Sequence, residues 1–283
     1  MEGANQEQIE FWNRLGQRWV EYQESLDRLW HAPGDAAIER AGVHVGERVI
    51  DVGCGCGASA LELARMVGPT GSVLGLDVSK PMLARARERA QEQGLANVEF
   101  AHVDASTHAF ADDRDLVFSR FGVMFFREPI AAFANLRRAL CPGGRLTFVC
   151  FRDRELNTWW TVPVAAASTV VTPPPLTPPR EPGPFALGEE AHIATILERA
   201  GFADIVCQTL DFDLILGADL DGATDFTINA GSAAGVVATA DAELKARARE
   251  AIRQSLSSYS GPKGVTLRAA TWIVRARCRA PGN

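Results

Sequence analysis

Short apolar runs alternate with amphipathic stretches between residues 48 and 151, and this alternation limits the possible folds more than any other feature. The apolar runs predict five strands, at residues 48–52, 72–76, 98–103, 115–119 and 145–151. Helices are expected between them, at residues 58–67, 79–93 and 129–140. A repeated strand-helix-strand order predicts an α/β fold, with a parallel sheet, helices on both faces and right-handed crossovers.

The segments on either side predict additions to this sheet. Residues 6–30 have the periodicity of an amphipathic helix, which we expect to end at Pro33-Gly34. Residues 172–184 contain seven prolines and predict a stiff connector. Mostly helical residues 219–258, with breaks at Gly222 and 231–235, precede a long strand at 265–279. We therefore expect four segments: an N-terminal helical lid at 1–42, a cofactor-binding core at 43–151, a proline-rich connector or lid at 152–188, and the rest of the sheet at 189–283 with a helical cap at about 217–260.

The composition is that of a globular protein. Hydrophobic residues make up 47% of the 283 residues, charged residues 23%, and the net charge is −6. An acidic chain does not attract phosphate backbones, which argues against nucleic acid as a partner. The first residues lack a basic and apolar leader, and no apolar run is long enough to span a membrane, so we expect a cytoplasmic protein. Cys54-x-Cys56 is too tightly spaced for a metal knuckle, so we expect no metal.

A glycine-rich loop follows the first expected strand, with Asp51, Gly53, Cys54, Gly55 and Gly57 in sequence. Glycine lets the backbone turn tightly and approach a ligand without a Cβ atom in the way. The next helix begins here and offers free N–H groups. Taken alone, such a loop also fits a plain strand-to-helix turn.

Three further features fall at the ends of expected strands, where parallel sheets bind ligands. Asp77 ends the second strand and can accept both hydroxyl hydrogens of a ribose. Asp104 follows the third strand, where its carboxylate and the Ala105 N–H suit the edge of an adenine. Ser119-Arg120 ends the fourth strand and is expected to face the same cleft. Each could instead be an ordinary loop residue, but their order makes a nucleoside-containing cofactor the better interpretation.

A dinucleotide is the competing interpretation. Gly53-x-Gly55-x-x-Ala58 satisfies the loose dinucleotide pattern, and Asp77 would suit the ribose of NAD. Against it, Asp51 stands where a dinucleotide fingerprint normally has an apolar residue, and Asp104 has no obvious dinucleotide role. An NAD(P)-dependent oxidoreductase therefore stays open as an alternative.

The motif set resembles that of the class I S-adenosylmethionine (SAM)-dependent methyltransferases, in the bacterial branch near the ubiquinone/menaquinone C-methyltransferases. The motifs that carry the resemblance are 51–57 (DVGCGCG), 75–79 (GLDVS), 103–105 (VDA), 115–119 (DLVFS) and 140–146 (LCPGGRL). The resemblance implies a seven-stranded sheet whose last strand, 265–279, runs antiparallel between the fifth and sixth. This sequence departs from the quinone-biosynthesis enzymes in the aromatic stretch 119–126 and in the proline-rich segment. These differences leave the identity of the substrate open.

The resemblance also implies roles for individual residues. The Gly53–Gly57 loop would lie beside the methionine part of SAM, supported by Asp51, and Asp77 would hold the ribose. Val78 and Met82 would enclose the adenine, with Asp104 and Ala105 at its edge. The backbone at Ser119 and Arg120 would receive the SAM amine. S-adenosylhomocysteine (SAH) would be the product.

Aromatic residues predict the acceptor pocket and a hydrophobic or planar small molecule as the methyl acceptor. The candidates are Trp12, Trp19, Tyr22, Phe121, Met124, Phe125, Trp159 and Trp160. Aromatic residues at helical spacing serve equally well as core. His31 is the best candidate for a general base, but methyl transfer by alignment alone is an equal alternative.

Two alternatives keep the cofactor and change the activity: an enzyme that uses SAM without methyl transfer, and a SAM sensor. We expect a monomer or a homodimer.

Overall fold

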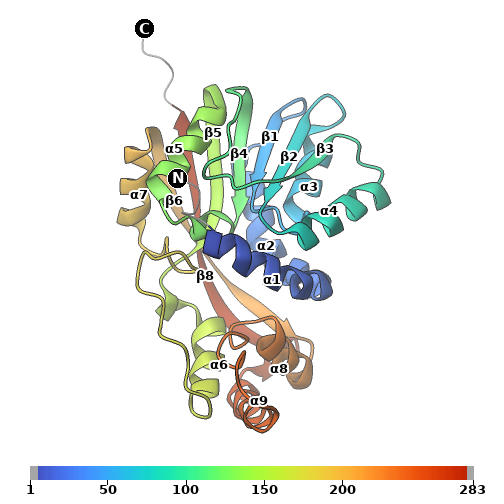
Figure 1. The fold of residues 1–283 in the computed structure, drawn as a ribbon, viewed down its shortest axis with the longest axis vertical. Coiled ribbons are helices and arrows are strands. Elements are labelled where there is room, and N and C mark those ends of the chain that lie inside the picture. Colours follow the sequence, from blue (N-terminus) through green and yellow to red (C-terminus); the bar gives the residue numbers. More distant parts are fainter. Residues whose placement is uncertain (1–5, 279–283) are drawn as a thin grey trace. The chain divides into compact units, whose positions relative to one another are not determined.

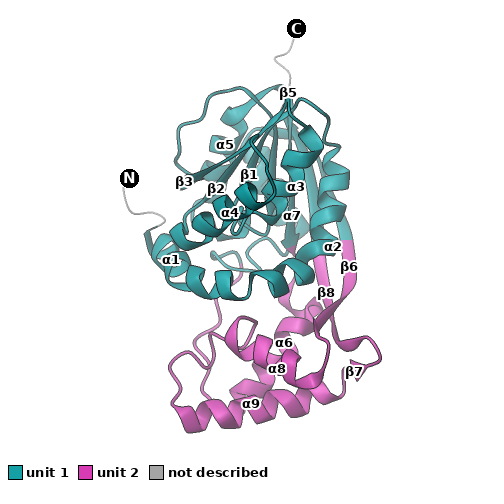
Figure 2. Cartoon of the chain, turned by 90° about the vertical axis from the view of Figure 1, so that its right-hand side faces the viewer, with its two compact units in different colours: residues 1–150, 180–209, 272–283 teal, residues 151–179, 210–271 magenta. Residues whose placement is uncertain are grey.

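The computed structural model describes residues 6–278 (Figure 1). Residues 1–5, on which the prediction about a leader rests, lie outside this range. Arg279, the last residue of the predicted final strand, lies outside it as well. The chain divides into two compact units (Figure 2). The first unit contains residues 1–150, 180–209 and 272–283, and the second contains 151–179 and 210–271. The strands β5, β6 and β8 each run from one unit into the other.

The sheet has the strand order β3-β2-β1-β4-β5-β8-β6, with a two-residue strand β7 paired to β8 alone. The strands are β1 (Arg48–Val52), β2 (Ser72–Asp77), β3 (Val98–His102), β4 (Arg114–Arg120), β5 (Leu140–Phe151), β6 (Phe202–Gly217), β7 (Ser260–Gly261) and β8 (Gly264–Cys278). β1 pairs in parallel with β2 and β4, β2 with β3, and β4 with β5. The C-terminal strands are antiparallel, with β8 between β5 and β6, so the predicted Rossmann-like methyltransferase fold is confirmed.

Helices pack on these strands in the first unit. They are α1 (Gln6–Glu21), α2 (Gln23–Ala41), α3 (Ala58–Val67), α4 (Lys80–Glu92), α5 (Pro129–Ala139) and α7 (Glu190–Arg199), with the 3-10 turn η1 (Val123–Phe125). α3 contacts β1 and β2, α4 contacts β3, and α5 contacts β4 and α7. Phe118, Phe133 and Phe148 are fully buried on β4, α5 and β5 and form part of this core.

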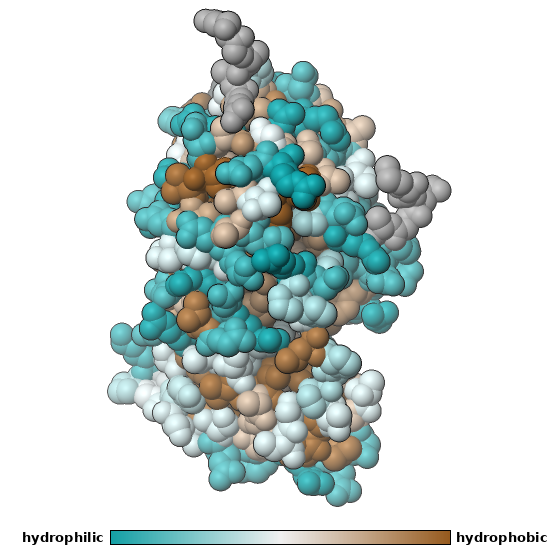
Figure 3. All heavy atoms as spheres, turned by 90° about the vertical axis from the view of Figure 1, so that its left-hand side faces the viewer, coloured by the Kyte–Doolittle hydropathy of each residue, from teal (hydrophilic) through white to brown (hydrophobic). Residues whose placement is uncertain are grey.

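The second unit is a helical layer beside the ends of long strands. It contains α6 (Thr158–Ser168), α8 (Leu220–Asn229), α9 (Ala242–Ser257) and the 3-10 turn η2 (Arg154–Leu156). α9 contacts both α6 and α8. The buried Asn157 joins α6 to β8, because its Oδ1 accepts from Trp159 Nε1 (3.0 Å) and from the Ala270 N–H (2.9 Å). On the face drawn in Figure 3, apolar side chains form several separate patches among hydrophilic ones.

Three sequence predictions about element ends were wrong. The first long helix ends at Glu21 rather than at Pro33-Gly34, and Pro33 lies inside α2. Both residues are buried, and a Cβ on Gly34 would stand 3.1 Å from Arg120 Cδ, so tertiary packing keeps the helix continuous. Gly222 does not break a helix. It lies in the first turn of α8, where its N–H donates to Oδ1 of the N-cap residue Asp219 (2.7 Å). β5 already begins at Leu140 and runs through the predicted helix stop at 142–144.

No helix among residues 6–278 is long and apolar enough to cross a membrane.

Candidate functional site

The glycine loop between β1 and α3 depends on glycine at three positions. Gly53, Gly55 and Gly57 have φ angles of 69°, 54° and 86°, which L side chains rarely adopt. A Cβ on Gly53 would lie 2.7 Å from the Cα of Gly122, which follows β4. The loop therefore runs directly against the end of the neighbouring strand, and any side chain at Gly53 would separate the two.

Asp77, the last residue of β2, holds the glycine loop in place. Its Oδ2 accepts the Gly55 N–H (2.8 Å) and its Oδ1 accepts the Ser79 N–H (2.8 Å). Burial raises the pKa of Asp77, and these backbone hydrogen bonds oppose the shift. A carboxylate oxygen has two lone-pair sites, so each oxygen can accept one further hydrogen bond from a ligand hydroxyl.

Asp51 is fully buried at the carboxyl end of β1. Its Oδ2 accepts the Ser59 hydroxyl (2.7 Å), while its Oδ1 is buried without a hydrogen-bond partner among the described residues. Burial raises the pKa of Asp51 to about 6, although Ser59 and the positive charge of Arg120 act against the rise. A buried acceptor without a partner is costly, which makes this oxygen a candidate contact for a cationic ligand group.

The end of β4 completes the same region. The Ser119 hydroxyl donates to the Val52 carbonyl (2.8 Å) and accepts the Gly122 N–H (3.2 Å). Phe121, between them, has a φ of 62°, an uncommon conformation for an aromatic residue. The hydroxyl thus joins the end of β1 to a strained turn after β4.

The residues predicted to hold an adenine follow β2 and β3. The Val103 N–H donates to the Asp77 carbonyl (3.2 Å), which joins the ends of these two strands. Asp104 is half-buried, and its Oδ1 accepts the Ser106 N–H (2.9 Å). Met82 is buried, and its Sδ would lie 3.8 Å from a Cβ on Gly55. Val78 is half-buried and lies just before the start of α4.

Asn135 on α5 positions this edge and was not foreseen from the sequence. Its Nδ2 donates to the carbonyls of Ala105 (3.0 Å) and His108 (2.8 Å), fixing the turn after β3. An isolated asparagine in a helix gives no sequence signal for such a role.

Asp27 on α2 is a second unforeseen residue. Its Oδ2 forms an ion pair with Arg89 of α4 (2.8 Å), and its Oδ1 lies 3.9 Å from Arg120 of β4. Arg89 also donates to the Cys56 carbonyl (2.7 Å). These contacts fasten α2 to α4 and β4, and through Arg89 to the glycine loop.

α1 is fastened to the start of α4 by Asn13. Its Nδ2 donates to the Val78 carbonyl (2.9 Å), and its Oδ1 accepts the Lys80 N–H (3.1 Å). Gly16, one turn later, is buried, and a Cβ there would collide with Ser79 Oγ. Helix α1 therefore lies tightly against the segment that carries Val78.

The predicted aromatic lining divides between the two units. Trp12 packs edge-on against Trp19 (5.3 Å between centroids) and Phe125 (4.9 Å), and all three rings are half-buried. Phe121 packs against Trp30 (5.2 Å), and Met124 is buried. Tyr22 is half-buried at the junction of α1 and α2.

Trp159 and Trp160 lie in the second unit. Trp159 is buried against Phe151 (5.1 Å between centroids), with Trp160 at 5.5 Å, so the structure gives Trp159 a packing role there.

His31 lies on α2 and is exposed. Its Nε2 is 3.1 Å from Asp35 Oδ2, one helical turn away, and its side chain is 73% exposed. The structure does not connect it to the glycine loop through any hydrogen bond that it describes.

The thiols of the loop are not activated. Burial raises the pKa of Cys56 to about 12 and that of Cys54 well above its ordinary value. Neither thiol is a nucleophile at neutral pH.

The fold is α/β with a glycine-rich loop at the carboxyl ends of parallel strands, and comparison with known proteins identifies the class. Residues 49–144 match a family described as "Methyltransferase domain". Aklanonic acid methyltransferase DauC of Streptomyces sp. (strain C5) is 33% identical over 172 residues, covering 60% of this chain and 64% of that protein.

The ubiquinone/menaquinone biosynthesis C-methyltransferase UbiE of Ectopseudomonas oleovorans is 38% identical over 122 residues, covering 42% of this chain and 70% of that protein. Among solved structures, YcgJ of Bacillus subtilis has a TM-score of 0.59 at 18% identity, covering 89% of this chain and all of that one. The chain belongs to the class I SAM-dependent methyltransferase family. Its matches to the first curated relatives span about half to two thirds of their length.

The residues at the loop fit the cofactor of this family. The partnerless Asp51 oxygen suits a cationic amine, and the spare lone pairs of Asp77 suit ribose hydroxyls. Gly53 and Gly122 contact each other directly, and neither has a side chain, so a ligand at this point of the loop would meet backbone atoms.

Proposed function

We propose that this protein transfers a methyl group from SAM to a small hydrophobic or planar molecule by in-line displacement. The observation that carries the proposal is the meeting of Asp51, Asp77 and Ser119 at one glycine loop, from the ends of three neighbouring strands. When bound, SAM supplies an activated methyl group on a sulfonium. The chain's own residues then bind, orient and shield the reactants.

Orientation is the main task of the protein in such a reaction. Holding nucleophile and methyl carbon in line can supply roughly 7–11 kcal/mol of the barrier. Asp77 would hold the ribose, Asp104 and Ala105 the adenine edge, and Asp51 with the Ser119–Arg120 backbone the amino acid end. Val78 and Met82 would flank the adenine, and the fastened α1 and α2 would keep water out.

The acceptor is proposed from the partly exposed aromatic cluster of Trp12, Trp19 and Phe125 in the first unit. Aromatic rings with open faces favour apolar, planar ligands. The names of DauC and UbiE, which refer to aklanonic acid and to quinone biosynthesis, support a small molecule as the substrate class. Residues 1–42 are proposed as a helical lid, residues 152–188 as a connector or lid, and residues from about 217 to 260 as a helical cap.

We propose that methyl transfer proceeds by alignment without a dedicated base. His31, the candidate base, is exposed and engaged with Asp35 on its own helix. A base is most effective when it reaches the proton that it removes.

The test is methyl transfer from methyl-tritiated SAM to a panel of phenols, quinols, aromatic amines, thiols and planar carbon acids. We expect label in at least one planar acceptor, and a rate within about threefold of wild type for His31→Ala, since a positioned base contributes about 10²–10⁴-fold. SAH binding with no label in any acceptor would instead indicate a SAM enzyme without methyl transfer, or a sensor. A loss of about 100-fold in His31→Ala would overturn the base-free mechanism.

A further inference from the structure

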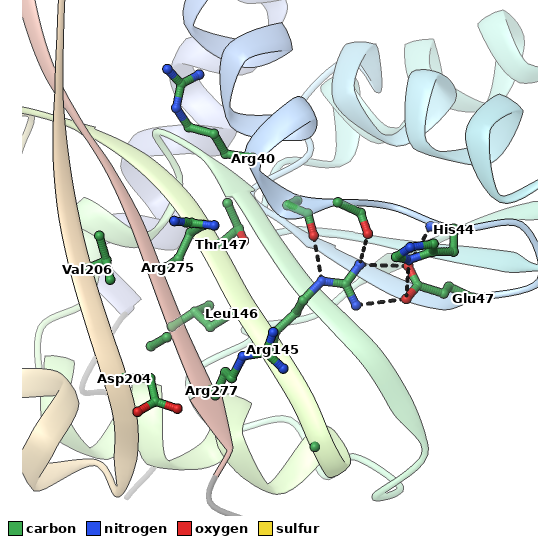
Figure 4. A pocket seen from close by; sticks show the side chains of 14 residues that line it. Arg40, His44, Glu47, Arg145, Leu146, Thr147, Asp204, Val206, Arg275 and Arg277 are labelled. Atoms are coloured by element: carbon green, nitrogen blue, oxygen red, sulfur yellow. Dashed lines mark hydrogen bonds and ion pairs between the residues drawn. The ribbon is translucent and has the colours of Figure 1, made fainter.

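A cavity lies in the first unit, at the opposite end of the parallel strands from the glycine loop (Figure 4). It has a volume of about 480 Å³. Its walls come from the end of α2, the segment before β1, and one face of the neighbouring strands β5, β8 and β6. The proposed methyl transfer uses none of these residues.

The strand face places side chains of alternate residues together, because residues i and i+2 of a strand point to the same side. Each of the three strands contributes one such pair to the cavity: Arg145 with Thr147, Arg275 with Arg277, and Asp204 with Val206. Arg40, near the end of α2, also lines the cavity, and Figure 4 shows its guanidinium pointing along the helix away from Arg145.

One arginine of the cavity is fully used by the fold. Arg145 pairs with both carboxylate oxygens of Glu47 (2.8 Å each) and donates to the carbonyls of Ala41 (2.6 Å) and Gly42 (2.8 Å). It therefore neutralises Glu47 and closes the C-terminal end of α2.

The other three arginines keep their positive charge. Arg40 donates only to neutral oxygens, those of Gln208 (2.8 Å) and Ala36 (3.0 Å). Arg275 and Arg277 are exposed and have no hydrogen bond or ion pair within the described residues 6–278. Asp204 is the one carboxylate of the lining that is not paired with Arg145. A chain of net charge −6 thus carries a local excess of positive charge here.

A polar group lies at the floor of the cavity without a partner. Thr147 is 1% exposed, and its Oγ1 has no hydrogen-bond partner among the described residues. Figure 4 shows it beside Arg275, and both residues line the cavity. Val206, which is exposed on β6, is the apolar side chain on this strand face.

We propose that this cavity binds the phosphate group of a small molecule. Guanidinium groups hold phosphate oxygens through paired N–H donors, and two or three of them can surround one tetrahedral dianion. The cavity exceeds the size of a phosphate ion, and the exposed Val206 side chain can contact a small organic group attached to it. Hydrogen bonds between charged groups are stronger than those between neutral groups.

The test is calorimetric titration of the full-length protein with inorganic phosphate and with phenyl phosphate, at constant ionic strength and with excess SAH in the cofactor site. We expect saturable binding of phenyl phosphate at a Kd below about 1 mM, tighter than that of phosphate alone. Arg275→Ala and Arg277→Ala should each weaken it at least about tenfold. Asp204→Asn should strengthen it, because it removes the competing carboxylate.

Arg247→Ala, which removes an exposed arginine on α9, is the matched control and should bind as wild type does. Arg275 and Arg277 are both exposed, so replacing either should leave the melting temperature unchanged. Absence of saturable binding in the wild type, or equal affinity in Arg275→Ala/Arg277→Ala and in Arg247→Ala, would overturn the proposal.

Discussion

At the scale of single residues, the carboxylates around the glycine loop carry both its shape and its binding capacity. Asp77 accepts two backbone N–H groups with its two oxygens, and Asp51 is buried with one oxygen unsatisfied among the residues that the structure describes. The first arrangement stabilises the loop itself, whereas the second costs stability that a cationic ligand group can recover.

Asp77→Asn tests the first arrangement. The amide keeps one acceptor for the backbone but loses the charge and one acceptor, so SAH affinity should fall about 10- to 100-fold. Calorimetry measures this, with Asp213→Asn, an exposed residue of β6, as the control. Unchanged affinity in Asp77→Asn would contradict its assignment to the ribose.

Asp51→Asn tests the cost of burying the Asp51 carboxylate, through the pH dependence of the unfolding free energy. The pKa of Asp51 is about 6 in the folded protein against an ordinary 3.8, so the folded state holds the proton more tightly than the unfolded chain. Ionisation therefore removes stability as the pH rises from about 4 to about 6, by up to about 3 kcal/mol above that range. Asp51→Asn, which cannot ionise, should gain stability over the wild type across this range.

Chemical denaturation at about pH 4.5, 6 and 7.5 measures the difference in unfolding free energy between Asp51→Asn and the wild type. A difference that does not grow with pH would show that Asp51 ionises freely in the folded protein.

At the scale of elements, α1 and α2 are fastened to the core by contacts that span long sequence separations. Asp27 meets Arg89 across 62 residues, and Asn13 meets Val78 across 65. Such contacts have no local pattern, so the sequence predicted that this segment is helical but not which residues fasten it to the core. The helix stop at Pro33-Gly34 was wrong for a related reason, because both residues are buried within α2 and Gly34 lies against Arg120, so tertiary packing overcomes the local helix-breaking tendency.

Gly16→Ala tests the attachment of α1. Alanine favours an isolated helix by about 1 kcal/mol over glycine. Here its Cβ would stand 2.8 Å from Pro81 Cγ as well as too close to Ser79 Oγ, and overpacking costs about 1–3 kcal/mol. Hydrogen exchange should therefore show faster exchange of the α1 amides in Gly16→Ala.

Gly235→Ala is the control, since nothing lies within 4 Å of a Cβ there. Equal protection of α1 in Gly16→Ala and in the wild type would contradict a tight contact between α1 and α4.

At the scale of the whole molecule, the family and the antiparallel last strand were implied by the resemblance that the motifs at the strand ends carry. Those motifs are local, and each lies where a parallel strand ends, which is why they could be predicted. The division of β5, β6 and β8 between two units could not be predicted from the sequence, because it depends on contacts of α6, α8 and α9 that no motif marks. The cationic cavity was missed for the same reason, since its lining comes from several separate elements.

Calorimetric titration of the protein with SAM, SAH and NADH under one set of conditions tests the cofactor assignment most directly. We expect one saturable site for SAM and for SAH, and no saturable binding of NADH. Saturable binding of NADH with none for SAM or SAH would contradict it.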